Sequence, residues 1–180
     1  MAKYSRIEWT DATWSPVTGC APISEGCQNC YARRMANRLR GRCGYPQNEP
    51  FKVTLHPERL NEPLKWKKPK LIFVCSMGDL FHEDVPDSFI SEIFYKMAVT
   101  AARHTYIILT KRPERALEWY KKNSKGIPVG YDFFIDFTPI YSDWPLPNVW
   151  LGVTAENQQR ADERIPILLQ IPAAVRFVSV

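Results

Sequence analysis

The chain alternates between short apolar runs and segments with helical periodicity. Apolar runs rich in β-branched and aromatic residues are typical of buried strands, whereas apolar positions spaced three and four apart indicate one face of a helix. Alternation of the two is the pattern of βα units and of a parallel sheet. We therefore expect strands at residues 14–18, 51–55, 71–75, 106–109, 149–153 and 175–180.

Helices are expected between these strands. The segment that starts at Asp87 is the clearest, because Asp87 can cap it and its apolar residues share one face. These residues are Ile90, Ile93, Phe94, Met97 and Ala101. Pro113 suits the first turn of the next helix. Further helices are expected at residues 30–39 and 58–66, and around Ala161, Ile165 and Leu168.

Residues 124–147 interrupt the alternation with a long connection. A connection of this length is more often a lid, an inserted hairpin or a partner surface than plain coil. It is rich in aromatic residues, namely Tyr131, Phe133, Phe134, Phe137, Tyr141 and Trp144. We expect an aromatic-rich insertion or lid within a single domain of residues 1–180.

The apolar run at residues 175–180 is the last of the chain, and no helical segment follows it. A parallel strand needs cover on both faces. We therefore expect the chain to be truncated at its C-terminal end, or its open last strand to be completed by another protein.

Composition indicates a folded protein that does not span a membrane. Hydrophobic residues make up 45% of the chain and charged residues 24%, which is typical of a globular domain. No apolar run reaches the roughly 18 residues that a transmembrane helix needs. The first ten residues lack the apolar stretch of a signal peptide. A cytoplasmic location is therefore expected.

Three of the five cysteines lie close together in the string CAPISEGCQNC: Cys20, Cys27 and Cys30. In a reducing compartment disulfides are rare, so clustered cysteines indicate metal or redox chemistry. Three thiolates on one loop can hold an iron–sulfur cluster and leave one coordination site open. Cys75 lies in an apolar run and is expected to be a small buried hydrophobe.

Cys43 keeps a second kind of metal site open. With Cys20, Cys27 and Cys30 it could complete a closed, tetrahedral zinc site. Four-cysteine zinc sites usually pair two C-x2-C knuckles, and this sequence has one. The spacing alone does not decide between zinc and an iron–sulfur cluster.

The formal net charge of +5 comes largely from two basic segments. They contain Arg33, Arg34, Arg38, Arg40 and Arg42, and Lys65, Lys67, Lys68 and Lys70. A basic face attracts phosphate-bearing partners. The arginines could instead form an ordinary solvated surface or offset the negative charge of bound thiolates.

Polar residues follow several of the expected strands. In parallel βα folds, functional groups gather at the C-terminal ends of the strands. In a barrel these groups would converge with the three thiolates on one mouth, although acidic residues there could be no more than helix caps. These polar groups lie at residues 76–79, 81–84, 110–112 and 154–158. His82, which lies among acidic residues, is expected to be a surface hydrogen-bonding residue.

Several separate blocks of the chain carry a family resemblance. They are residues 7–20, 26–32, 73–82, 109–113 and 150–157. Together they resemble a family of uncharacterised phage and prophage proteins with a three-cysteine motif, related to the radical S-adenosylmethionine enzymes. Members of that family normally continue past the point where this chain ends, and a phage-encoded protein would work in the cytosol of its host.

The resemblance implies a partial TIM-like (βα)6 barrel with a 4Fe–4S cluster on Cys20, Cys27 and Cys30. S-adenosylmethionine would chelate the open iron, and one electron would cleave its sulfonium to a 5′-deoxyadenosyl radical that abstracts hydrogen from a substrate. The residues expected to bind this cosubstrate are Ser76, Asp79, Lys111, Glu156 and Asn157. The chain departs from the common C-x3-C-x2-C motif in its six-residue first gap, and Asn29 stands where an aromatic residue usually precedes the last cysteine.

Three functions therefore compete. The leading one is an iron–sulfur enzyme of the radical type with an unknown substrate. The basic charge and the phage setting suggest that this substrate is a nucleic acid or nucleotide. The second is a zinc module on Cys20, Cys27, Cys30 and Cys43 that binds nucleic acid through the neighbouring arginines. The third is a non-catalytic protein that binds a host or phage partner through residues 124–147 or through the open last strand.

Overall fold

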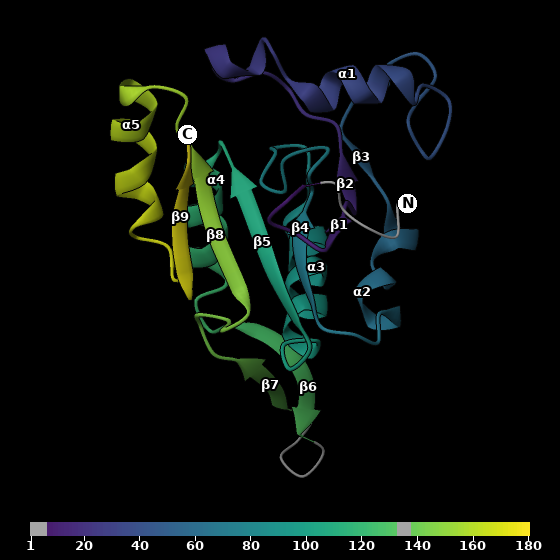
Figure 1. Ribbon diagram of the computed structural model, residues 1–180. Helices are drawn as coiled ribbons and strands as arrows, with labels where there is room; N and C mark the ends of the chain where they lie inside the picture. The colour runs from purple at the N-terminus through teal and green to yellow at the C-terminus, as the bar shows by residue number, and fades with distance from the viewer. Residues whose placement is uncertain (1–6, 133–137) are drawn as a thin grey trace.

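The centre of the molecule is an open parallel β-sheet. Figure 1 shows the computed structural model, which describes residues 7–132 and 138–180. Five parallel strands have the order β1-β4-β5-β8-β9. Their bounds are Ala12–Trp14 (β1), Lys70–Val74 (β4), His104–Thr110 (β5), Val149–Thr154 (β8) and Val175–Ser179 (β9). The expected parallel α/β architecture is confirmed, but the sheet does not close into a barrel within the described residues.

The expected second strand, at residues 51–55, is confirmed only in its last two residues, and it does not join the parallel sheet. Of this segment only Thr54–Leu55 (β3) is extended, and it pairs antiparallel with Val17–Thr18 (β2) in a separate sheet of two strands. The expected first strand is likewise divided between β1 and β2. Pro16 lies between them and has no backbone N–H to donate to a ladder, so β1 cannot continue in register.

The main helices follow the predicted periodicity. They are Tyr31–Arg38 (α1), Asp87–Val99 (α3), Pro113–Lys122 (α4) and Gln158–Leu168 (α5). The segment expected at residues 58–66 forms only the 3-10 turn Pro57–Arg59 (η2) and the short helix Glu62–Lys65 (α2). Asp87 is the first residue of α3, and Pro86 occupies the cap position. No helix in residues 7–132 and 138–180 is long and apolar enough to cross a membrane.

Residues 124–147 contain a β-hairpin. Ile127–Asp132 (β6) and Thr138–Ser142 (β7) pair antiparallel. In Figure 1 the hairpin lies at the end of the sheet opposite to α1, so it does not cover the cysteines that precede α1. The expected aromatic residues Phe133, Phe134 and Phe137 lie outside the described residues.

The two faces of the sheet differ in their cover. α3 and α4 pack on one face, as Figure 1 shows, and bury Ile72, Tyr106, Ile108 and Leu151 completely. The centre of this core is aromatic, with the ring of Phe94 stacked 4.4 Å from that of Trp119. The opposite face carries an open apolar groove of about 380 Å³. Its lining includes Trp9, Leu71, Ile107, Leu109, Trp150 and Phe177.

The aromatic centre of the core gives a first prediction. Phe94→Ala removes a fully buried ring that also contacts Trp144 and Tyr120. We expect the free energy of unfolding to fall by about 3–5 kcal/mol, because the surrounding rings cannot close the cavity. Urea denaturation measures the change. Val99→Ala, at an exposed position of the same helix, should shift it by less than about 0.5 kcal/mol; equal effects of the two substitutions would contradict the packing described.

Candidate functional site

A close backbone contact places the cysteine loop, residues 19–30, against the turn that follows β4. Gly19 and Gly78 form an isolated parallel bridge, and the Gly19 N–H donates to the Met77 carbonyl at 2.9 Å. Gly19 has φ +83°, and a Cβ there would lie 2.1 Å from the Lys52 carbonyl oxygen. Only glycine fits this contact, which holds Cys20 beside the C-terminal end of β4.

One cavity joins the three cysteines to the ends of the strands. It measures about 330 Å³ and is called the cysteine cavity below. The residues that line it include Cys20, Cys27, Cys30, Ser76, Asp79 and Lys111. The structure thus brings the three cysteines together with three of the five other candidate residues. Glu156 and Asn157 are not among the lining residues.

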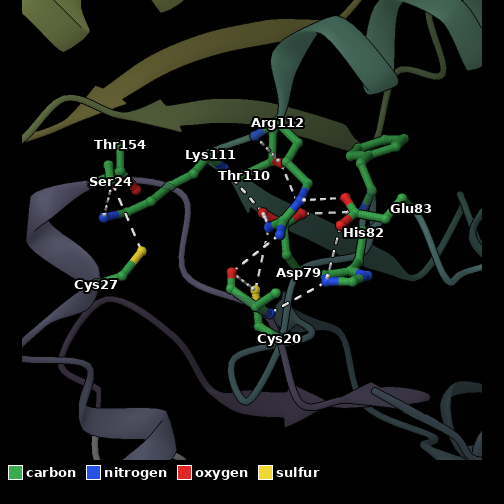
Figure 2. A network of polar contacts seen from close by, with 12 residues as sticks. Cys20, Ser24, Cys27, Asp79, His82, Glu83, Thr110, Lys111, Arg112 and Thr154 are labelled. Atoms are coloured by element: carbon green, nitrogen blue, oxygen red, sulfur yellow. Dashed lines mark hydrogen bonds and ion pairs between the residues drawn. The ribbon is translucent and has the colours of Figure 1, made fainter. Parts of the chain in front are cut away.

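Asp79 is a buried hub rather than a free carboxylate (Figure 2). One carboxylate oxygen accepts from the Phe81 N–H at 3.0 Å and from the Thr110 hydroxyl at 2.8 Å. The other accepts from the Lys111 N–H at 3.1 Å and from the Arg112 guanidinium at 3.4 Å. Asp79 therefore joins the ends of β4 and β5, and both of its oxygens already have donors.

Arg112 contacts Cys20, the first cysteine of the loop. The sequence did not predict this contact. Arg112 Nη1 lies 3.2 Å from Cys20 Sγ, and its Nη2 donates to the Ala21 carbonyl at 3.1 Å. Burial and the charge of Asp79 raise the pKa of Cys20 to about 11, while Arg112 opposes this shift. The only signal in the sequence is a second cation beside Lys111 at the end of a predicted strand.

Lys111 and Glu156 hold the middle of the cysteine loop. Lys111 Nζ donates to Glu156 Oε1 at 3.1 Å and to the Ser24 hydroxyl at 3.4 Å, and Ser24 also donates to Glu156. Arg164 donates to the other oxygen of Glu156 at 2.8 Å. Burial alone would raise the pKa of Glu156, but these donors lower it to about 2.

The second cysteine lies in the 3-10 turn Glu25–Cys27 (η1). Its sulfur is 3.7 Å from the Ser24 hydroxyl. Burial opposes ionisation of Cys27. Hydrogen bonds with the Ile23 and Ser24 backbone and with the Ser24 side chain, together with the charge of Lys111, nevertheless lower its pKa below the usual value. Thiolate is the form that binds iron or zinc, so this environment fits a metal ligand.

The third cysteine caps the helix that leads away from the cavity. Cys30 occupies the cap position of α1, and Tyr31 is the first residue of that helix. The Tyr31 side chain is 53% exposed, and its hydroxyl donates to the Ser76 carbonyl. Asn157, in contrast, caps α5 by accepting from the Arg160 N–H at 2.9 Å, and it also donates to Glu25.

Cys43 lies apart from the other three candidate ligands. It follows α1, is exposed, and its carbonyl accepts from Arg59 at 2.7 Å. It does not line the cysteine cavity. Within the described ranges, no three His, Cys, Asp or Glu side chains form a group that could hold a metal ion. A four-cysteine zinc site, in which every sulfur lies about 2.3 Å from one ion, would require this part of the chain to rearrange.

An iron–sulfur cube needs a different arrangement of cysteines from a zinc site. Each cysteine binds a different iron of the cube, so the three sulfurs surround a cluster instead of converging on one ion. Cys20, Cys27 and Cys30 all line one cavity. Cys75 also lines it, but its side chain is buried, as expected, and burial raises the pKa of its thiol to about 12. The donor set therefore fits a cluster held by three thiolates.

His82 supports the cysteine loop from inside the protein, so its expected surface position was wrong. Its side chain is 2% exposed. The Ala21 N–H points at its Nε2 at 3.2 Å, and the Asp84 N–H points at its Nδ1 at 3.1 Å. Burial and the charge of Arg112 lower the pKa of His82.

Comparison with known proteins gives one family. Residues 4–180 match the family model described as "Protein of unknown function (DUF5131)". No curated protein and no solved structure matches the chain.

The role of Asp79 can be tested by removing its charge. Asp79→Asn leaves the buried Arg112 without its buried carboxylate partner, so we expect the free energy of unfolding to fall by about 3 kcal/mol or more. Asp84→Asn alters a carboxylate that is 71% exposed and should change it by less than about 0.5 kcal/mol. Urea denaturation of both variants decides; a stable Asp79→Asn protein would show that the hub is dispensable.

Glu156 predicts a pH dependence. Its pKa falls from an ordinary 4.5 to about 2 on folding, so its ionised form stabilises the folded state above pH 4.5, and this contribution disappears as the pH falls toward 2. The stability difference between wild type and Glu156→Gln should therefore shrink between pH 4.5 and 2. Urea midpoints across this range measure it, with the exposed Glu118→Gln as the control. A difference that is constant with pH would refute the assignment.

Proposed function

We propose that this chain, which belongs to the DUF5131 family, binds a 4Fe–4S cluster and uses it to cleave S-adenosylmethionine reductively. The proposed ligands are Cys20, Cys27 and Cys30, and the reaction would modify a substrate held beside them. The observation that carries the proposal is the single cavity that these cysteines share with the C-terminal ends of β4 and β5. When bound, such a cluster would supply an open iron for the cosubstrate and one electron for its cleavage.

Arg112 is proposed as the residue that positions and tunes the first ligand. Its guanidinium donates to the Cys20 sulfur while Asp79 and Glu83 hold it in place, at 3.4 Å each. A cationic donor at a ligand sulfur offsets the negative charge that thiolates bring to a buried site. Hydrogen bonds to the sulfurs are one of the factors that set the reduction potential of a cluster.

Ser76 and Lys111 are the candidates for direct contact with the cosubstrate. Both line the cysteine cavity, and the Lys111 side chain is 21% exposed. An ammonium at this place suits the carboxylate of an amino-acid cosubstrate. The other three expected residues are assigned supporting roles, because both oxygens of Asp79 and of Glu156 already accept from protein donors and Asn157 caps α5. Glu156 and Ser24 take two of the three N–H donors of the Lys111 ammonium, which leaves one for a ligand.

The open sheet is proposed to be a partial barrel of the (βα)6 kind found in radical S-adenosylmethionine enzymes. Two observations support this kinship. Residues near the C-terminal ends of β4, β5, β8 and β9 line the cysteine cavity, and the face away from α3 and α4 is an apolar groove rather than a packed layer. Leu109 and Ser179 line both this groove and the cysteine cavity. In such a barrel the groove would be the interior, where a substrate is kept from water.

Metal analysis tests the cluster. The protein, purified without oxygen, should contain iron and sulfide in near-equal amounts. Its visible spectrum should show the broad charge-transfer absorption of an iron–sulfur cluster at about 400 nm. Cys20→Ala, Cys27→Ala and Cys30→Ala should each lose iron. Cys43→Ala and Cys75→Ala should retain it. Stoichiometric zinc that depends on Cys43 would establish the zinc module instead, and iron lost in Cys75→Ala would mean that no iron is open.

Product analysis tests the reaction. The reduced, cluster-loaded protein should convert S-adenosylmethionine to 5′-deoxyadenosine, detected by chromatography, and Lys111→Ala should raise the concentration of S-adenosylmethionine needed. Lys121→Ala, an exposed lysine of α4, is the matched control and should leave that concentration unchanged. A loaded, reduced protein that makes no 5′-deoxyadenosine with candidate substrates present would refute the reaction and leave the cluster standing.

A further inference from the structure

We propose that a single-stranded nucleic acid binds along α1, with its phosphates on the arginines of that helix and a base at the rim of the cysteine cavity. The basic row is defined as Arg34, Arg38, Arg40 and Arg42, all of which are exposed. That the strand is the substrate rests on the proposed function. That it binds does not, because the arginines and the rim are independent of any cluster.

The basic row consists of charges that the protein itself does not neutralise. Across residues 7–132 and 138–180, none of its four arginines forms an ion pair, whereas five other arginines pair with carboxylates. The paired ones are Arg59, Arg112, Arg115, Arg160 and Arg164. Four unpaired guanidinium groups therefore lie within residues 34–42, where together they create a positive potential that favours a polyanion.

The position of the basic row connects it to the cysteine cavity. α1 begins at Tyr31, directly after Cys30, and runs away from the loop (Figure 1). Arg34 and Arg38 are four residues apart, so they lie on one side of the helix and rise by about 6 Å along it. Arg42 extends the row, and its guanidinium donates to the Arg38 carbonyl at 2.6 Å. A strand that follows these charges is led to the cavity.

A second cavity beside α1 adds aromatic and cationic groups. It measures about 440 Å³ and is lined by Arg33, Phe51 and Lys52, with Glu49 and Asp84 as its carboxylates. The Arg33 guanidinium lies over the Phe51 ring, 5.6 Å from its centre. Cys20 and Phe51 line both this cavity and the cysteine cavity, so the two adjoin. A cationic groove with aromatic rings for base stacking is how proteins hold single strands.

The rim favours a single strand over a duplex. Tyr31 lines the cysteine cavity and is more than half exposed, and Phe51 lines the same cavity. A base inside a duplex stack cannot reach a cavity of this kind without flipping out, which costs a few kcal/mol. An unpaired base can enter without that cost and stack on either ring.

Fluorescence anisotropy with a labelled 20-nucleotide single strand tests the inference. Each phosphate contact contributes about 0.7 to the slope of log K against log salt for single strands, so losing three contacts should weaken binding about a hundredfold at 0.1 M salt. We expect this of the R34Q/R38Q/R42Q variant, together with a slope that is shallower by about 2. Phe51→Leu should weaken binding about tenfold, as loss of one stacked base does.

A matched variant controls for total charge. K65Q/K67Q/K68Q also removes three positive charges. These lysines are exposed and precede β4, so they lie at the end of that strand opposite to the cysteine cavity. It should bind within about threefold of wild type. Equal loss in both triple variants, stronger binding of the duplex form of the same sequence, or binding of anionic phosphatidylserine vesicles in place of the strand would overturn the proposal.

The same measurement separates this proposal from the proposed function. Wild-type protein from which iron has been removed with a chelator should still bind the strand with unchanged salt dependence. If the wild-type protein carries a cluster but binds no strand, only the nucleic-acid inference fails. If it binds the strand but holds no iron, the proposed enzyme fails while the binding surface stands.

Discussion

The buried ion pair between Asp79 and Arg112 is the interaction on which the cysteine loop depends. Both side chains are more than nine-tenths buried, so each has given up its hydration. Such a pair is retained only when further hydrogen bonds satisfy the remaining donors and acceptors. Asp79 finds them on Phe81 and at the end of β5, and Arg112 finds them on Cys20 and Ala21. The pair therefore transmits the rigid geometry of the sheet to a loop that has little regular structure.

A second set of charges holds the same loop from its other side. Glu156, at the end of β8, contacts Ser24 and Lys111, and Arg164 of α5 neutralises its second oxygen. The cysteine loop is thus attached to three neighbouring strands of the sheet. Under the proposed function, thiols placed in this way would receive a cluster without the cost of ordering a free loop.

The sequence predicted the sheet best where a strand consists of a continuous apolar run. Residues 71–75, 106–109 and 149–153 are continuous apolar runs, and all three correspond to central strands. Residues 51–55 alternate in polarity, and their pairing with β2 depends on Pro16 and on contacts far along the chain. Those contacts cannot be deduced from a local pattern. The open shape of the sheet likewise depends on the packing of side chains.

The site was predictable as a location and not as a set of roles. Strand direction alone placed the cysteines, Ser76, Asp79 and Lys111 at one end of the sheet. Whether a carboxylate there is free or paired depends on side-chain geometry, and Asp79 and Glu156 are both paired. The same limit applies to Arg112, whose contact with Cys20 joins residues 92 positions apart. The sequence left Cys43 as a possible fourth ligand, because it does not show the course of the chain after α1.

Electron paramagnetic resonance of the reduced protein, with and without S-adenosylmethionine, tests the central claim most directly. A cluster held by three cysteines has one iron that the cosubstrate can bind, so adding S-adenosylmethionine should shift the spectrum of the reduced cluster. Cosubstrate labelled with ¹⁵N at its amino group should then show coupling of that nitrogen to the cluster. A reduced cluster whose spectrum does not change, or a protein with zinc and no such spectrum, would contradict the account.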